Sequence, residues 1–500
     1  MNLASILRCH ADSHGDKTAI EFRSERINYL QLWHRIQGYA AYLHERGIRQ
    51  GDRVGLALKE HSCHLILHYA LARLGAVILP VDQRWTSTEK AGAATAFQAK
   101  LLILEEDAGT QTGIETLTIN KDLQEANPGR LPPMPNHPDL ALLISLSSGT
   151  TGGPKGALVT HEQMYQRFIS QWVTIGFNSR DRFLGPTPLF FGAGRSFAMA
   201  FLAAGATVIL DPPPHEPEQL VAAVNESGAT VTFMVPTQLR GLLPLYKDVL
   251  LLPRLGKLLI SGAALYPQEA REIREKVNPG LIGYYASSEG GGISVLDTDE
   301  FDDYAHTAGR PTFRTEVQIV DNGDSPVKPG ETGRLRYRGP GVAGRFIDAD
   351  GTEHATNPEG WFYPGDLAEK TDSGHIILRG RDKDVINRGG VNVYPVDVEA
   401  VLMQLPAVRE AAVKGEPSEK FGETVTAFIA ANEVITADAL NDHCRNLLAP
   451  YKIPSRYVFL DQLPKKASGK LDKQALVEET LKETCEQTIY NQADNGSQRK

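Results

Sequence analysis

Short apolar runs alternate with helical patterns through the N-terminal part of the chain. Runs typical of buried strands lie at residues 53–58, 206–210, 230–235, 257–261 and 281–285. Helical patterns lie at residues 30–46, 63–74, 197–204, 217–226 and 267–276. Short strands separated by helical patterns of about ten residues indicate βαβ units, and therefore parallel sheets with helices on their faces.

The pattern changes near residue 316. Strand-like segments at residues 317–320, 334–338 and 342–346 are separated by Asp-Asn-Gly, Pro-Gly and Gly-Pro turns, which predicts a small antiparallel β-subdomain. After residue 380 the pattern is α+β. One strand is predicted just before this change, at residues 375–379. After it, strands are predicted at residues 408–413, 424–430 and 456–460, and helices at residues 395–405 and 437–448.

These patterns predict an α/β fold with two domains. Residues 1–381 would form a large N-terminal domain of parallel sheets flanked by helices, with the β-subdomain at about residues 312–381. Residues 382–480 would form a small, mobile α+β lid domain, and residues 481–500 a flexible tail. A chain of 500 residues agrees with this division, because single cores stop growing near about 250–300 residues.

Charge and hydropathy narrow the function classes. The net charge of −9 argues against a nucleic-acid partner, although a local basic groove remains compatible with a small phosphorylated ligand. The longest uncharged apolar stretch, residues 196–210, is shorter than the ~20 residues of a membrane span. The N-terminus lacks the apolar core of about 7–15 residues that a signal peptide needs, so we expect a cytoplasmic protein.

A cluster of His61, Cys63 and His64 has two interpretations. As a metal site it lacks a second pair of ligands. We therefore favour a helix whose cysteine packs inward while the histidines lie at its edge.

The glycine-rich segment at residues 147–156 is the strongest single motif. It reads Ser-Ser-Gly-Thr-Thr-Gly-Gly-Pro-Lys-Gly and follows an apolar run at residues 140–146 that is typical of a strand. Glycines let the backbone approach an anion, hydroxyls add hydrogen-bond donors, and Lys155 adds positive charge. The segment is not a Walker A loop, because Pro154 precedes the lysine and Gly156 replaces the Mg²⁺-binding Ser or Thr. We interpret it as a phosphate-binding loop rather than a mobile polar loop.

Four further motifs follow along the chain, at residues 284–289, 360–367, 380–390 and 463–471. The first ends a predicted parallel strand with Tyr-Tyr-Ala-Ser-Ser-Glu, at the sheet edge where open α/β sheets bind ligands. The others contain Gly-Asp, a charged segment with paired glycines, and Lys-Lys-Ala-Ser-Gly-Lys. Taken singly, each is also compatible with a surface turn or a charged linker.

Together and in this order, the five motifs resemble the adenylate-forming superfamily. Its members include acyl- and aryl-CoA synthetases, adenylation domains of peptide synthetases and beetle luciferases. The resemblance extends from about residue 5 to residue 480. Further matches lie at residues 51–54, 74–77, 235–237, 309–311 and 451–454.

The resemblance implies roles for the residues that would hold ATP and Mg²⁺. The phosphates would be wrapped by Ser147, Ser148, Gly149, Thr150, Thr151, Gly152 and Lys155. Ser288 would touch the α-phosphate, and Glu289 with Thr150 would ligate Mg²⁺. Carboxylate attack on ATP brings two anions together, and a metal ion aimed at the reacting centre reduces their repulsion.

The resemblance also assigns the nucleoside. Gly262, Ala263 and Tyr285 would line the adenine. Asp366 would hold the ribose, with Arg381 beside it.

The C-terminal domain would serve both half-reactions. Lys470 would bridge the acid carboxylate and the α-phosphate. The domain would then rotate about Lys383, and Gly389 with Gly390 would form a channel for the thiol.

The acyl pocket is the least defined part. Phe190, Phe191, Arg195 and Gly290 would help to wall it. In similar proteins a His often stands at the position of Phe191, and amino-acid-activating domains carry an Asp that this segment lacks, which argues against an amino-acid substrate. Arg195 would meet a second carboxylate of a dicarboxylic acid, or would be a surface or phosphate contact.

Three other positions differ from the family pattern. Ser288 replaces Thr and keeps the hydroxyl, Pro364 replaces a Thr, and Asn387 replaces a frequent Lys. We expect an AMP-forming acid–thiol ligase that uses ATP, Mg²⁺ and coenzyme A. The alternatives are a stand-alone adenylation enzyme that loads the pantetheine thiol of a carrier protein, and a non-catalytic nucleotide-binding regulator.

Overall fold

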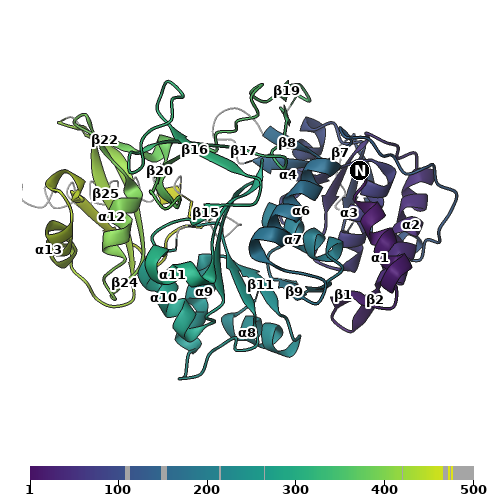
Figure 1. Cartoon of the computed structure of the whole chain (residues 1–500), viewed down its shortest axis with the longest axis horizontal. Coiled ribbons are helices and arrows are strands. Elements are labelled where there is room, and N and C mark those ends of the chain that lie inside the picture. The colour runs from purple at the N-terminus through teal and green to yellow at the C-terminus, as the bar shows by residue number, and fades with distance from the viewer. Residues whose placement is uncertain are drawn as a thin grey trace, which may run out of the picture. The chain divides into compact units, whose positions relative to one another are not determined.

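The computed structural model describes residues 1–106, 113–147, 155–212, 215–263, 265–348, 350–418, 420–465, 471–472 and 475–476. The chain divides into two compact units (Figure 1). The first unit comprises Met1–Ala264, Glu269–Gln318 and Arg336–Pro364, and the second comprises Leu265–Gln268, Ile319–Leu335 and Gly365–Lys500. Residues 319–335 and 365–381, which the sequence pattern places in the β-subdomain of the N-terminal domain, group with the second unit. The domain boundary after residue 381 stays a prediction.

The first unit contains a sheet with the strand order β19-β18-β8-β7-β4-β3-β5-β6. Its strands are β3 (Arg53–Ala57), β4 (Val77–Pro80), β5 (Leu101–Leu104), β6 (Glu115–Thr118), β7 (Ala141–Ser147), β8 (Lys155–Thr160), β18 (Arg345–Ile347) and β19 (Glu353–Ala355). Strands β3, β4, β5, β6 and β7 pair in parallel. Strands β8, β18 and β19 extend the sheet by antiparallel pairing.

A second sheet has the strand order β15-β14-β13-β12-β11-β9-β10-β1-β2. Its strands are β1 (Thr18–Phe22), β2 (Glu25–Asn28), β9 (Arg182–Gly185), β10 (Thr207–Leu210), β11 (Val231–Met234), β12 (Lys257–Ile260), β13 (Leu281–Ser287), β14 (Gly291–Leu296) and β15 (Arg310–Pro311). The strands from β1 to β13 in this order pair in parallel, and β2, β14 and β15 are antiparallel edges.

Helices cover and separate these sheets. They are α1 (Ala4–His14), α2 (Tyr29–Glu45), α3 (Ser62–Leu74), α4 (Ser87–Ala96), α5 (Lys121–Gln124), α6 (His161–Ile175), α7 (Gly192–Ala203), α8 (Pro217–Glu226), α9 (Pro236–Leu242), α10 (Pro267–Lys276) and α11 (Phe301–Tyr304). Helices α3 and α6 each contact strands of both sheets, so they belong to a central layer. Every residue of α3 is buried, including the polar Ser62, His64, His68 and Arg73.

The remaining elements form two smaller sheets. Strands β16 (Glu316–Val320), β17 (Gly333–Arg338), β20 (Asp366–Lys370) and β21 (Ile376–Arg381) pair in this order. The other sheet contains β22 (Ile386–Arg388), β23 (Val391–Val393), β24 (Val408–Ser418), β25 (Gly422–Ala431) and β26 (Arg456–Phe459). Helices α12 (Pro395–Leu402) and α13 (Ala437–Leu447) pack on the latter over an apolar core. Among the described residues, no helix is both long and apolar enough to cross a bilayer.

One predicted strand is wrong in extent and in partner. Residues 342–346 were expected to form part of the β-subdomain, but β18 begins at Arg345 and pairs with β8 of the large sheet, with Arg345 opposite Leu158. The carbonyl of Val342 accepts a hydrogen bond from the Gln163 side chain at 2.9 Å. That contact holds the start of the apolar segment as a loop against α6.

The cluster of His61, Cys63 and His64 lies at the start of α3. His61 is the N-cap: its Nδ1 accepts from the His64 amide at 3.3 Å, and its Nε2 lies 3.0 Å from Glu105 Oε2. Cys63 packs inward, with its sulfur 3.1 Å from the Tyr39 hydroxyl. The expectation that both histidines lie at the helix edge is wrong for His64, which is fully buried. Within the described ranges, no group of three or more His, Cys, Asp or Glu side chains is arranged to hold a metal ion.

Three fully buried histidines make the first unit sensitive to acid. Burial lowers the pKa of His68 and of His161 to about 3, and the nearby Arg195 charge adds to the effect at His68. Burial also lowers the pKa of His64 well below its usual range. These groups bind protons in the unfolded chain below pH ~6.5 but stay neutral in the fold. Their contribution to stability is therefore present above that pH and is lost as the pH falls toward 3.

We expect the free energy of unfolding to fall by about 1.4 kcal/mol per pH unit for each such histidine below pH ~6. Urea unfolding followed between about pH 7 and about pH 4.5 measures this slope. The substitution His68→Leu should reduce the slope, whereas His34→Asn, at an exposed position of α2, should leave it unchanged. A stability that stays constant across this range would contradict the assignment.

Candidate active site

Strands β7 and β8 hold the two ends of the glycine-rich loop side by side. They pair in antiparallel register, with Ser147 opposite Lys155. The Lys155 ammonium lies 3.4 Å from Asp348 Oδ1 at a partly exposed position. The predicted phosphate-binding residues Ser148, Gly149, Thr150, Thr151 and Gly152 lie outside the described residues, as does the Ser147 side chain.

The turn that carries Ser288 and Glu289 connects the antiparallel strands β13 and β14. Ser287, the last residue of β13, forms hydrogen bonds that hold this turn. The Ser287 hydroxyl accepts from the amides of Glu289 at 3.2 Å and Gly290 at 3.1 Å, and it bonds the buried Tyr337 hydroxyl at 2.5 Å. The backbone of the turn is therefore fixed before any ligand binds.

Arg167 of α6 holds the same turn from the protein interior. Its guanidinium donates to the carbonyls of Ser288 at 3.3 Å, Glu289 at 2.5 Å and Gly341 at 2.8 Å. The sequence offered no signal for Arg167 or Tyr337. Neither residue belongs to a recognised motif, and an arginine on a helix is usually solvated.

Gly290 is needed because Tyr337 fills the space beside it. A Cβ at Gly290 would lie 2.3 Å from the Tyr337 hydroxyl oxygen, which is buried and cannot swing away. We expect Gly290→Ala to displace the turn, to lower the rate of adenylate formation at least about tenfold and to destabilise the fold by about 1–3 kcal/mol, as overpacking does. ATP–pyrophosphate exchange and thermal unfolding measure the two effects.

Gly92→Ala is the matched control for this substitution. Gly92 is exposed within α4, and a Cβ there would meet no atom within 4 Å. The Gly92→Ala substitution should leave the exchange rate unchanged and the stability of the fold unchanged or slightly higher, because alanine favours the helical conformation. If Gly290→Ala catalysed ATP–pyrophosphate exchange at the parent rate, the prediction that displacing this turn impairs adenylate formation would be wrong.

The predicted adenine-binding residues share one edge of the second sheet. Gly262 and Ala263 follow β12, and Tyr285 lies in the parallel strand β13. The last paired residues of these strands are Ile260 and Gly283, so both segments continue from the same end of the sheet. Gly262 has φ +101°, which glycine adopts most readily and which turns the chain at the end of the strand.

The segment before α7 carries the predicted acyl-pocket residues Phe190 and Phe191. The Arg84 guanidinium lies 5.0 Å from the Phe190 ring centroid and 5.6 Å from that of Phe191, and Asp82 holds this arginine through two hydrogen bonds. Glu60 accepts a hydrogen bond from the Leu189 amide at 3.1 Å. Side chains from the ends of two other strands thus clamp this segment.

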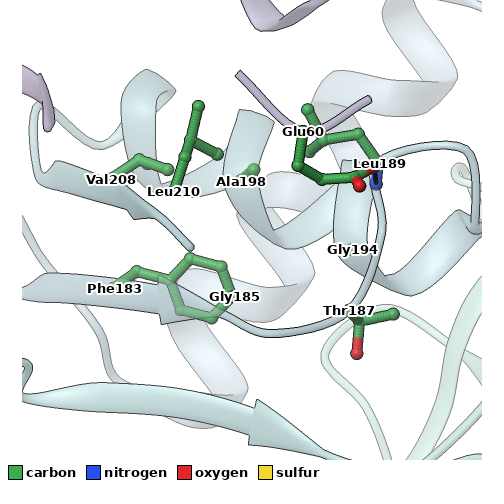
Figure 2. A pocket seen from close by; sticks show the side chains of 9 residues that line it. All are labelled: Glu60, Phe183, Gly185, Thr187, Leu189, Gly194, Ala198, Val208 and Leu210. Carbon is green, nitrogen blue, oxygen red and sulfur yellow. Dashed lines mark hydrogen bonds between the residues drawn. The ribbon is translucent and has the colours of Figure 1, made fainter. Parts of the chain in front are cut away.

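Thr187 and Leu189 of this segment help to line a small cavity, whose lining side chains are drawn in Figure 2. Its lining residues are Glu60, Phe183, Gly185, Thr187, Leu189, Gly194, Ala198, Val208 and Leu210. The volume of about 10 Å³ is room for a single water molecule, so the cavity does not take the body of a carboxylic acid. Burial raises the pKa of the Glu60 carboxyl, whereas its bond from the Leu189 amide acts in the opposite direction.

Arg195 lies inside the protein and not at its surface. Its side chain is 3 % exposed, and Nη1 donates to the carbonyls of Leu189 and Phe190, both at 3.1 Å. The interpretation of Arg195 as a surface contact is therefore wrong. Its predicted contact with a second substrate carboxylate stays a prediction.

The second unit brings Asp366 and Arg381 together. They face each other across β20 and β21, with Arg381 Nε 3.0 Å from Asp366 Oδ1. Lys383 is exposed in a short 3-10 turn.

Gly389 and Gly390 form a two-residue hairpin turn between β22 and β23. Both have positive φ, as a type I′ turn requires. The Gly390 amide donates to the Asn387 side chain at 2.9 Å, which gives Asn387 a structural role in the turn. Lys470 lies outside the described residues.

Sequence comparisons identify the family. The profile of AMP-binding enzymes matches residues 7–346, and the profile of the AMP-binding enzyme C-terminal domain matches residues 397–470. The chain belongs to the AMP-binding enzyme family. An indoleacetate–CoA ligase from Aromatoleum aromaticum is 30% identical over 95% of this chain and 97% of its own. A 2-succinylbenzoate–CoA ligase from Bacillus licheniformis is 28% identical over 94% of this chain and 98% of its own.

Solved structures agree with this assignment. The o-succinylbenzoate–CoA synthetase of Bacillus subtilis, in complex with its acyl-adenylate intermediate, is 25% identical and has a TM-score of 0.85, over 94% of this chain and 97% of that chain. The same synthetase has been solved with ATP and a magnesium ion. These relatives confirm the predicted α/β fold and the class of acid–CoA ligase for this AMP-binding enzyme. They also confirm ATP, Mg²⁺ and coenzyme A as its co-substrates and cofactor.

Proposed function

We propose that this AMP-binding enzyme activates an aromatic carboxylic acid and transfers the acyl group to coenzyme A. The main support comes from the two ligases described above. Their names give indoleacetate and 2-succinylbenzoate as the acids, both of which are aromatic, and both relatives match almost the whole chain. The pair Phe190 and Phe191, rigidly clamped by Arg84, supports an aromatic-lined pocket.

The reaction has two steps. An oxygen of the acid carboxylate bonds to the α-phosphorus of ATP, and the bond to pyrophosphate breaks. The thiolate sulfur of coenzyme A then bonds to the acyl carbon, and AMP leaves. We assign Ser288 to the α-phosphate, Asp366 with Arg381 to the ribose, and Lys470 to the charge between the acid and the phosphate.

The residues present fit Mg²⁺. That ion demands oxygen ligands and is held by one or two carboxylates together with substrate phosphates, rather than by a cage of protein side chains. The single carboxylate of Glu289 on a rigid turn matches this requirement, and within the described ranges no larger metal cluster competes with it. When bound, the ion reduces the negative charge that opposes carboxylate attack.

A panel of acids tests the proposal. The protein is incubated with ATP, Mg²⁺ and coenzyme A together with indoleacetate, 2-succinylbenzoate, benzoate, a straight-chain fatty acid, malonate or an amino acid, and pyrophosphate and thioester are measured. Turnover confined to aromatic acids is the expected result. Turnover of only aliphatic acids would contradict the aromatic class. Pyrophosphate without a coenzyme A thioester would instead favour a carrier-protein thiol as acceptor.

A further inference from the structure

Three arginines, Arg73, Arg167 and Arg195, are buried in the first unit, and two of them, Arg167 and Arg195, contact the predicted site. Arg167 of α6 is 7 % exposed and Arg195 of α7 is 3 % exposed. In the part of the chain that the structure describes, neither guanidinium pairs with a carboxylate. Burying a charge is costly unless hydrogen bonds compensate it. Backbone carbonyls supply such bonds to both arginines, and the Glu289 charge also acts on Arg167.

Both arginines bind backbone carbonyls, and all of these except the Gly341 carbonyl lie at the predicted site. Arg167 binds the carbonyls of Ser288 and Glu289, which lie on the turn assigned to the nucleotide and Mg²⁺. Arg195 binds those of Leu189 and Phe190, which lie on the segment assigned to the acid. A planar guanidinium fixes the direction of each carbonyl, and therefore the peptide planes from which the adjacent side chains project.

Packing locks Arg167 in this geometry. A Cβ at Gly341 would lie 2.9 Å from its Cγ, and one at Gly291 would lie 3.0 Å from its Cδ. Glycine at both positions lets the backbone close over the aliphatic part of the arginine. This close packing holds the aliphatic part of Arg167 against the two glycines.

The backbone just before Arg195 is also tightly packed. A Cβ at the preceding residue, Gly194, would lie 2.4 Å from the carbonyl oxygens of Thr187 and Pro188. The Nε atom of Arg195 is buried and has no hydrogen-bond partner within the described residues. Burial lowers the pKa of Arg195 to about 10, and the neighbouring charge of Arg167 adds to that effect.

We propose that Arg167 and Arg195 are separate positioning residues for the two substrates. Arg167 holds the Ser288–Glu289 turn where it meets ATP and Mg²⁺, and Arg195 holds the Leu189–Phe190 segment where it meets the acid. The inference rests on the proposed function, because that function assigns the turn to nucleotide and the segment to acid. Neither arginine touches the reacting atoms.

Reciprocal kinetics test this division. The variants Arg167→Lys and Arg195→Lys keep the charge but replace the planar fork with a single ammonium. ATP–pyrophosphate exchange is measured while ATP, Mg²⁺ and the acid are varied in turn. For Arg167→Lys we expect the KM for ATP and the Mg²⁺ requirement to rise about 10- to 100-fold, with the KM for the acid changed less than about threefold. For Arg195→Lys we expect the KM for the acid to rise about 10- to 100-fold, with the KM for ATP and the Mg²⁺ requirement changed less than about threefold.

Each arginine serves as the matched control for the other. Equal changes in all three parameters for both variants would overturn the proposal, because a loss of general stability would act in that way. Parent-like kinetics in both would overturn it as well. Gly341→Ala provides a second test of Arg167, because it displaces the side chain without removing the charge, and it should reproduce the ATP and Mg²⁺ pattern. If Gly92→Ala gave the same pattern, the effect of Gly341→Ala could not be attributed to displacement of Arg167.

The role of Arg167 can be tested even if the proposed substrate class is wrong. If no aromatic acid is a substrate, the acid found in the panel replaces it in the exchange assay. Binding of ATP to the parent and to Arg167→Lys, titrated with Mg²⁺ in the absence of any acid, then tests Arg167 independently. Unchanged ATP binding in that titration would overturn its role whatever the acid is.

Discussion

Replacing Lys470 with alanine is expected to lower the rate of adenylate formation by about 10²- to 10³-fold, the usual effect of removing one preorganised charge or donor from a transition state. The acid carboxylate and the α-phosphate are both anionic, and the proposed position of Lys470 between them would neutralise part of that repulsion. This contact would be made mainly as the new bond forms. The loss should therefore appear in kcat more than in KM.

A bypass experiment separates this role from a general one. Synthetic acyl-adenylate supplied together with coenzyme A enters the reaction after the step that would need Lys470. We expect Lys470→Ala to form thioester from it at a rate within a few-fold of the parent. An equal loss in both half-reactions would contradict the assignment.

Lys465→Ala is the matched control for Lys470. Lys465 lies in the same segment of the chain, but its ammonium pairs with Glu410 at 2.6 Å. Its removal should leave both half-reactions near the parent rate, because a partly exposed ion pair contributes little. A loss of adenylate formation here as well would point to disruption of the whole segment.

Periodicity predicted most of the helices and strands because burial imposes it directly. The predicted helices at residues 217–226 and 267–276 coincide with α8 and α10. By contrast, α7 begins at Gly192, five residues before the predicted start. Glycines at positions 192 and 194 concealed this first turn, because glycine is a poor helix former, yet the crowded carbonyls of Thr187 and Pro188 admit no larger residue at Gly194.

The motifs predicted the residues that we propose to meet ligands, but they gave no signal for the residues that hold those segments in place. Asp366 and Arg381 are 15 residues apart in sequence, and the hairpin of β20 and β21 brings them into contact. Arg167 and Tyr337 converge on the Ser288–Glu289 turn from α6 and β17. Contacts of this kind depend on tertiary packing between elements that are distant in the chain, and no local pattern records them.

Replacing Asp366 with asparagine is expected to raise the KM for ATP and to lower kcat/KM by about 100-fold. The carboxylate is the proposed acceptor of both ribose hydroxyls, and each hydrogen bond to a charged group is worth about 1.5–3 kcal/mol. Arg381 at 3.0 Å orients the Asp366 carboxylate, and the amide would lose this ion pair as well. Steady-state kinetics with varied ATP measures the effect. Asp372→Asn, in the exposed turn that follows β20, is the matched control and should behave as the parent does.

Deoxynucleotides identify the contact itself. If Asp366 accepts hydrogen bonds from the ribose, the parent should discriminate against 2′-deoxy-ATP and 3′-deoxy-ATP by about tenfold or more each, whereas Asp366→Asn should discriminate much less. The coupling between substitution and missing hydroxyl, as in a double-mutant cycle, isolates this interaction from any general damage to the fold. Equal discrimination by parent and variant would place the ribose elsewhere. In that case the ion pair between Asp366 and Arg381 would serve only to join β20 and β21, and the loss of activity would follow the loss of stability.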